Sequence, residues 1–161
     1  MSGTFVTLRC DPSDARAQES AHLLILAFDE KEPLREVHHL LDRWAMPTGL
    51  EKLVLYFRSP GSHAIVLDVL AVWHELLSPG LSVTCCEAIA AQAIPEPDPG
   101  EVRIEFYRRP DAIDSQFIRH TDSCVHLTHV ATGETFQIQG RSRVRNLELV
   151  KLQLASWLAS R

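Results

Sequence analysis

The sequence lacks the cysteine spacings that hold metals or disulfides. Its four cysteines are Cys10, Cys85, Cys86 and Cys124, and none of them forms a Cys-x-x-C pair. The adjacent Cys85 and Cys86 cannot both face the same side of a strand. We therefore expect neither a metal centre nor a disulfide framework, and this cysteine usage fits a reducing compartment.

A long apolar run is also missing. The longest run, residues 63–77, is interrupted by Asp68, His74 and Glu75. It is too short and too polar to span a bilayer, so it predicts a buried helix. The first nine residues contain one basic residue and no apolar signal core, which argues against secretion and does not match an Arg-rich transit peptide.

Basic residues are outnumbered, with 16 Lys and Arg against 21 Asp and Glu. Residues 1–100 contain 7 basic and 14 acidic residues, whereas residues 101–161 contain 9 and 7. Neutralisation of phosphates dominates the affinity of proteins for nucleic acid. Any RNA contact should therefore come from the C-terminal part and should need help from other partners.

One proline-rich segment divides the chain. Pro95, Pro97 and Pro99 disfavour a helix and give an extended spacer. We predict an N-terminal α/β module over residues 1–94, a linker over 95–100 and a second domain over 101–161.

The N-terminal module is predicted to contain a β-α-β unit. The expected elements are a strand at 4–9, a helix from Asp11-Pro12-Ser13 to about 29, a second helix from near 33 to 46–47, a strand at 53–57, the buried helix and a strand at 81–86. On the second helix, His38, His39 and Asp42 are interpreted as an exposed polar stripe and not as metal ligands.

The second domain is predicted to be a small sheet covered by one helix. Val102, Ile104 and Phe106 alternate with polar residues, as do two later segments at 125–127 and 136–139, with a turn at 131–134 between them. Apolar residues then recur at helical spacing, at Val144, Leu147, Val150, Leu154 and Trp157. The fold class expected for the whole chain is α+β.

A block in this second domain has a family likeness. Residues 119–133 read RHTDSCVHLTHVATG, and a basic run follows, with Arg141, Ser142 and Asn146 in the order Arg-Ser-x-x-x-Asn. This order resembles the catalytic domain of class I peptide chain release factors, over about residues 102–158. The resemblance implies three to four strands covered by a C-terminal helix. In pattern alone, the N-terminal module is similar to the start of the domain that precedes the catalytic one.

The chain departs from that family at the catalytic loop. Where the family has Gly-Gly-Gln, this chain has Asp114, Ser115 and Gln116. Glycine allows backbone angles that cost other residues about 1–2 kcal/mol each, and it lets a backbone N–H approach the tRNA ester. Asp114 also adds negative charge where negative charge would develop. We expect no catalytic residue and no enzyme activity, and we interpret Ser115 and His120 as loop residues, not as parts of a nucleophilic triad.

Basic residues flank both matching blocks. The resemblance implies that they contact ribosomal RNA, because arginine binds phosphate with two parallel hydrogen bonds and stacks on bases. The predicted RNA-binding residues are Arg108, Arg109, Arg119, His120, Arg141, Arg143, Arg145 and Lys151.

The resemblance implies a non-catalytic, ribosome-associated protein. It would be a structural component or an assembly factor of the large subunit, placed in the mitochondrial matrix or alternatively in the cytoplasm. Its partners would be ribosomal RNA and ribosomal or assembly proteins, with a protein-facing N-terminal module, no membrane and no small-molecule cofactor. One alternative is a divergent peptidyl-tRNA hydrolase that rescues stalled ribosomes, which the retained Gln116 favours. Another is an α+β interaction module without an RNA role, which the net negative charge favours.

Overall fold

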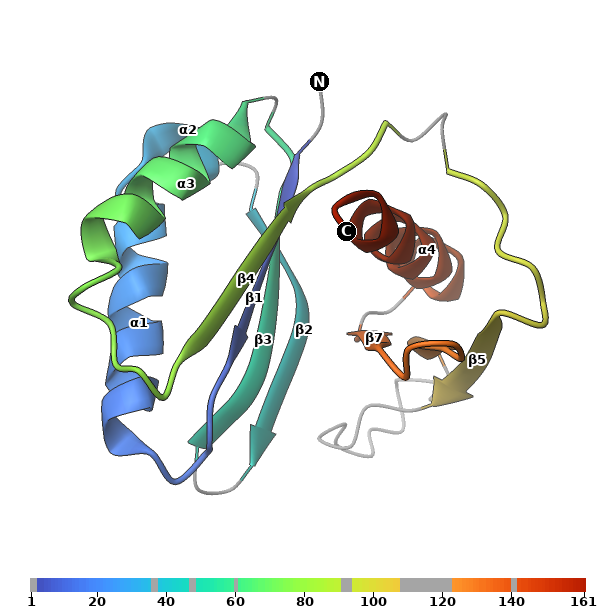
Figure 1. Ribbon diagram of the computed structural model, residues 1–161, viewed down its shortest axis with the longest axis horizontal. Helices are drawn as coiled ribbons and strands as arrows, with labels where there is room; N and C mark the ends of the chain where they lie inside the picture. The colour runs from blue at the N-terminus through green and yellow to red at the C-terminus, as the bar shows by residue number, and fades with distance from the viewer. Residues whose placement is uncertain are drawn as a thin grey trace, which may run out of the picture. The chain divides into compact units, whose positions relative to one another are not determined.

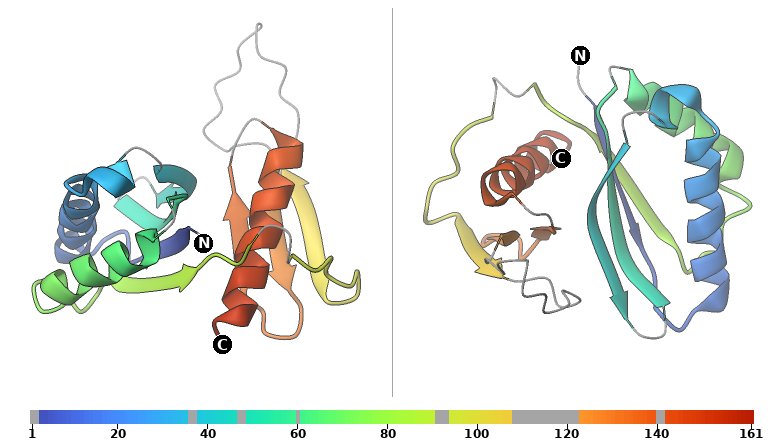
Figure 2. Two further views of the ribbon diagram at one scale, coloured as in Figure 1. Left: turned by 90° about the horizontal axis from the view of Figure 1, so that it is seen from above. Right: turned by 180° about the vertical axis from the view of Figure 1, so that it is seen from behind.

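The chain divides into two units between Ala90 and Ala91. The first is a sheet with helices packed on it, and the second is a sheet with the helix α4 (Arg143–Ala159) packed on it (Figures 1 and 2). The computed structural model describes residues 3–35, 38–46, 49–59, 61–90, 94–107, 123–139 and 142–161. The predicted linker, residues 95–100, lies within the second unit. No helix in the described ranges combines the length and the hydropathy that a bilayer crossing requires.

The first unit is an antiparallel sheet with the strand order β2-β3-β1-β4. Its elements are β1 (Thr4–Arg9), α1 (Ala15–Asp29), α2 (Glu32–Arg35), β2 (His38–Met46), β3 (Gly49–Phe57), α3 (Ser62–Trp73) and β4 (Ser82–Glu87). Because β1 pairs antiparallel with both β3 and β4, those two strands run parallel with β1 between them. The predicted β-α-β unit is confirmed in this split form. A second unit made by β1, α1 and β2 interleaves with it, as in ferredoxin-like folds.

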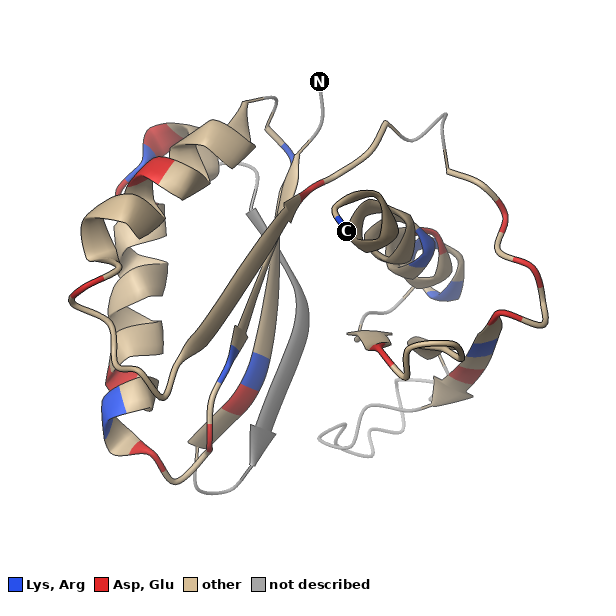
Figure 3. Cartoon of the chain, viewed as in Figure 1, with Lys and Arg blue, Asp and Glu red and all other residues tan. Residues whose placement is uncertain are grey.

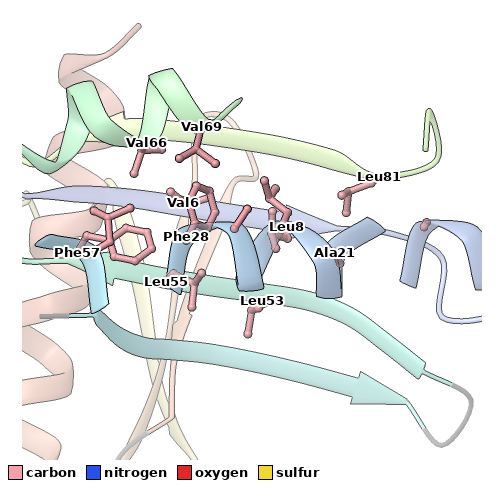
Figure 4. Packing of buried hydrophobic residues seen from close by; sticks show 14 residues of the cluster. Val6, Leu8, Ala21, Phe28, Leu53, Leu55, Phe57, Val66, Val69 and Leu81 are labelled. Atoms are coloured by element: carbon pink, nitrogen blue, oxygen red, sulfur yellow. The ribbon is translucent and has the colours of Figure 1, made fainter. Parts of the chain in front are cut away.

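Both long helices of the first unit cover the same face of the sheet (Figure 1). One cluster of buried side chains joins them to it, including Val6 and Leu55 of the strands, Phe28 of α1 and Val66 of α3 (Figure 4). Phe28 meets the ring of Phe57 edge to face at 5.4 Å between centroids. This cluster is the hydrophobic core of the unit.

Helix α1 begins later than its sequence predicted. Asp14 is the N-cap, and its Oδ1 accepts the N–H of Ala17 at 3.1 Å. Pro12 lies in the preceding turn, outside the first helical turn where we expected it. Within this turn, Asp11 Oδ1 accepts the N–H and the hydroxyl of Ser13, at 2.9 and 2.7 Å.

The predicted second helix is wrong. Only a short helix, α2, forms there, and residues 38–46 form the edge strand β2 against β3. Its register shifts between Leu40 and Asp42 and again between Trp44 and Ala45. Such bulges interrupt the two-residue alternation, so the segment carries no strand signature in its sequence. His38 and His39 occupy successive strand positions, and the helical face expected to group them with Asp42 does not exist.

The second unit is a three-stranded antiparallel sheet, in the order β5-β6-β7, with α4 packed on β6 and β7. Its elements are β5 (Val102–Tyr107), β6 (Cys124–His129), β7 (Thr135–Ile138) and α4 (Arg143–Ala159). This confirms the predicted sheet covered by one helix. Gly133 has φ 73° in the turn between β6 and β7, a left-handed conformation that favours glycine.

Alternating residues of the strands form the core of the second unit. Val125, Leu127, Phe136 and Ile138 are buried on the face that α4 covers. The indole of Trp157 meets Phe136 edge to face at 5.6 Å between centroids. The α+β fold class is therefore confirmed.

Two predicted apolar faces are partly exposed. Val144 belongs to the predicted apolar stripe of the last helix but is 68% exposed. In that turn the helix buries Asn146 and turns Val144 outward. The run at 63–77 forms a helix as far as Trp73 and a turn beyond it, and α3 is buried along one side only. Val72 is 72% exposed on its outer side.

Candidate nucleic-acid interface

The N-terminus of α4 is fixed beside the start of β6. The Ser142 hydroxyl accepts the Arg145 N–H at 3.2 Å and so caps the helix. The buried Asn146 donates its side-chain amide to the carbonyl of Ser123 at 2.9 Å. The first turn of α4 is thereby held against the residue that precedes β6.

Arg143 lies at this helix end and stacks on the sheet. Its Cζ is 3.7 Å from the centroid of the Phe106 ring on β5. Such a cation–π contact contributes about 0.5–1 kcal/mol at an exposed site. One flat face of the guanidinium lies on the ring. Its N–H groups point outward in the guanidinium plane and can therefore still donate to a phosphate. The side chain is therefore oriented before any ligand arrives.

The same end of the sheet carries a polar pair. The amide Nε2 of Gln137 on β7 donates to the hydroxyl of Tyr107, the last residue of β5. The register places Tyr107 opposite Cys124, the first residue of β6. The end of β5 and the start of β6 therefore meet near the N-terminus of α4. Because successive strand residues point to opposite faces, Tyr107 and Gln137 lie on the face away from α4 and Arg143.

Only part of the predicted RNA-binding set can be placed. Arg143, Arg145 and Lys151 are on α4. The other members, together with the loop triplet, lie outside the described residues: Arg108, Arg109, Asp114, Ser115, Gln116, Arg119, His120 and Arg141. Arg143 and Arg145 both lie in the first turn of α4, but two positions apart their side chains point to different sides of the helix.

Lys151 has a partner that the sequence analysis missed. Its Nζ donates to both carboxylate oxygens of Glu96, at 3.0 and 2.9 Å. Lys151 is eight positions beyond Arg143, about 12 Å along the helix axis at 1.5 Å per residue. It is therefore separate from the arginine pair and is held by an acid from the proline-rich segment. Phe106 was likewise assigned only to the core, because nothing local links it to Arg143.

The thiols of β4 are poor nucleophiles. Burial raises the pKa of the Cys86 thiol to about 11, and negative charge on Cys85 adds to the effect. Burial also raises the pKa of Cys85. Both thiols stay protonated at neutral pH, and thiols react as thiolates. Within the described ranges, no three His, Cys, Asp or Glu residues are placed to hold a metal ion.

Comparison with known proteins finds a similar solved structure. No protein-family model matches the chain, and no curated protein matches it. The solved structure of RF2 of Thermus thermophilus matches with a TM-score of 0.72 and 19% sequence identity, over 99% of this chain and 49% of that one. The chain thus spans about half the length of the structure it matches.

This similarity is one of fold. It shows that the chain has a release-factor-like fold, as the block at 119–133 predicted. The match extends to almost the whole chain, well beyond the 102–158 segment where the sequence carries the resemblance. The first unit, whose likeness rested on its pattern alone, is therefore included in the similar fold.

Proposed function

We propose that this chain is a ribosome-associated protein. We propose that it binds ribosomal RNA through the N-terminus of helix α4 in its second unit. The observation that carries the proposal is the stacking of Arg143 on Phe106 at the N-terminus of α4, in a chain with a release-factor-like fold; Arg145 lies in the same helical turn. A guanidinium held on a ring is suited to bind a backbone phosphate or to stack on a base. The proposed RNA is that of the large subunit, as the family resemblance suggests.

The proposed role is structural or in assembly, without catalysis. Asp114 and Ser115 stand where the family has the glycines of its hydrolytic loop. Loss of one oxyanion donor typically costs about 100- to 1000-fold in rate, and a carboxylate beside the developing charge opposes it further. The mitochondrial matrix is the location that we propose on the family resemblance, and its test is fractionation of the source cells.

The RNA contact is tested by binding of the chain to large-subunit RNA over a range of salt concentrations. The affinity for RNA falls as the salt concentration rises. Each lost phosphate contact reduces the steepness of log affinity against log salt by about 1. The double variant Arg143→Gln/Arg145→Gln should therefore make this dependence less steep by about 2. The matched control is Arg16→Gln/Arg58→Gln, which removes two exposed arginines of the first unit. Equal slopes for the two double variants would refute the proposed interface.

The alternative is a divergent peptidyl-tRNA hydrolase, which the presence of Gln116 favours. Incubation of the chain with stalled ribosomes carrying labelled peptidyl-tRNA separates the two functions. We expect no release above the rate without protein. Release that Gln116→Ala abolishes would establish the hydrolase and exclude the non-catalytic role.

A further inference from the structure

Helix α3 is apolar on its outer side as well as on its inner side. Val66, Val69 and Trp73 point toward the core cluster of the first unit (Figure 4 labels the two valines). Leu67 and Val72 lie on the other side, and Leu76 follows in the next turn, with exposures of 46, 72 and 70%. A helix that is apolar all round is normally covered on all sides. Here the described residues cover one side.

The exposed residues form a continuous surface. We call it the outer face of α3. It consists of Ala64, Leu67, Asp68, Ala71 and Val72, which follow helical spacing, and of Glu75 and Leu76 in the turn that follows the helix. Residues three and four positions apart are neighbours on a helix surface. The two alanines lie beside the larger side chains and present little bulk, so another helix can approach closely. Contiguous apolar surface with a polar rim is typical of interaction sites.

The stretch of sequence that contains this face has charge of one sign. Asp68 and Glu75 belong to it, and no Lys or Arg occurs anywhere from residue 59 to residue 102. Figure 3 shows α3 and β4 without a basic position. His74 follows the helix and is exposed, and the basic residues of the neighbouring α2 segment are Lys31 and Arg35. An anionic apolar face repels RNA and anionic lipid, and it attracts a partner with positive charge.

We propose that the outer face of α3 is a docking site for an amphipathic helix of a partner protein, with an apolar stripe flanked by Lys and Arg. Leu67, Val72 and Leu76 would contact the stripe, as in other complexes in which a helix lies on an apolar surface. Asp68 and Glu75 would pair with the flanking cations. This site is separate from the proposed RNA contact on α4, and neither proposal depends on the other.

The probe is a labelled synthetic helix of about 18 residues, long enough to be helical in water. It has leucines at positions i, i+3, i+4 and i+7 and lysines beside them. Fluorescence anisotropy with the full chain, in the absence of RNA, should show saturable binding. Val72→Ser/Leu76→Ser should weaken that binding about tenfold or more, since it removes two exposed apolar side chains from the contact.

The matched control is Val130→Ser/Leu158→Ser, which removes one valine and one leucine, both exposed, from the second unit. It should leave peptide affinity unchanged. Thermal unfolding of both double variants should match the parent chain, because these four side chains are exposed. Equal loss of affinity in the two double variants would overturn the site.

The charge is tested separately. Asp68→Asn/Glu75→Gln should weaken binding of the lysine peptide about threefold to tenfold and flatten its salt dependence. A peptide with glutamate in place of lysine should not bind. Equal binding of the two peptides would overturn the proposal. So would binding of the chain to anionic lipid vesicles, or self-association in sedimentation that Val72→Ser/Leu76→Ser abolishes, because each would assign the face to another occupant.

Discussion

Lys151 Nζ donates to both carboxylate oxygens of Glu96, at 3.0 and 2.9 Å, and so holds the proline-rich segment on helix α4. The Lys151 side chain is 20% exposed, whereas that of Glu96 is 80% exposed. The acid therefore covers a cation that the family resemblance assigns to RNA. In this arrangement a carboxylate occupies the place that a phosphate would take.

Glu96→Gln should raise the affinity of the chain for ribosomal RNA. The substitution removes the competing carboxylate and leaves the Lys151 ammonium available to a phosphate. The slope of log affinity against log salt should steepen by about 1, the value of one added phosphate contact. Titration of labelled RNA at several salt concentrations measures both quantities.

Asp98→Asn is the matched control for this experiment. It removes one negative charge from the same segment, and its amide oxygen can still accept the Gly100 N–H that Asp98 accepts at 3.1 Å. An equal gain for both variants would mean that net charge, and not the Glu96–Lys151 pair, sets the affinity.

Arg143→Lys should weaken RNA binding although the charge is kept. Lysine has neither the flat face that stacks on Phe106 nor the planar set of donors. The expected loss is about two- to fivefold, the equivalent of about 0.5–1 kcal/mol. Phe106→Leu, which removes the ring, should give a similar loss, measured by the same RNA titration.

Arg145→Lys serves as the control for the stacking effect. In the described part of the chain, the Phe106 ring is stacked by Arg143 and not by Arg145. A lysine at position 145 should therefore cost less than a lysine at position 143. Equal losses would show that the ring does not orient the guanidinium.

The second unit could be predicted from sequence because its strands alternate without interruption. Val102, Ile104 and Phe106 point one way along all of β5, and β6 and β7 continue the pattern. The first unit was less predictable. Two bulges interrupt the alternation of β2, and its strand conformation depends on pairing with β3, which local periodicity does not record.

The sequence predicted which residues belong to the candidate site, but it did not predict which residues those side chains contact. The arginines of α4 follow from their place in the family-like block. The contacts of the basic residues on α4 join Arg143 to Phe106 and Lys151 to Glu96, pairs that are far apart in sequence. Composition and spacing do not encode such contacts, because they arise only when α4 packs on the sheet.

The free energy of unfolding should fall as the pH rises from about 9 to about 11. Burial raises the pKa of Cys86 to about 11 in the folded chain, above the ordinary thiol value of 9.0. Between these values the unfolded chain loses its proton first, so high pH favours unfolding. The contribution is fully present below pH 9 and is lost as the pH rises through the folded pKa.

Cys86→Val isolates that contribution. Valine fits a strand and does not titrate, so the variant should lose less stability over this pH window than the parent chain. Urea unfolding at several pH values measures the difference. Parallel curves for parent and variant would mean that the Cys86 thiol is not buried enough to resist ionisation.

Gln18→Leu should destabilise the first unit. The pairing of β1 with β3 ends at Arg9 and Lys52, and the Gln18 amide continues it toward the start of β3. Its Oε1 accepts the Leu50 N–H at 2.6 Å and its Nε2 donates to the Leu50 carbonyl at 2.5 Å. Leucine leaves both backbone groups without these bonds, at a cost of about 1–3 kcal/mol in the free energy of unfolding. Urea unfolding followed by circular dichroism measures it.

Two further variants show whether both hydrogen bonds matter. Gln18→Glu keeps an acceptor for the Leu50 N–H but places a carboxylate against the Leu50 carbonyl. Its folded state therefore favours the protonated acid, so the variant should be destabilised at pH 7 and should recover as the pH falls toward about 4. Glu19→Leu, at the exposed neighbouring position, should change stability by no more than about 0.5 kcal/mol. If Gln18→Leu were as mild as Glu19→Leu, the amide would not be closing the end of the sheet.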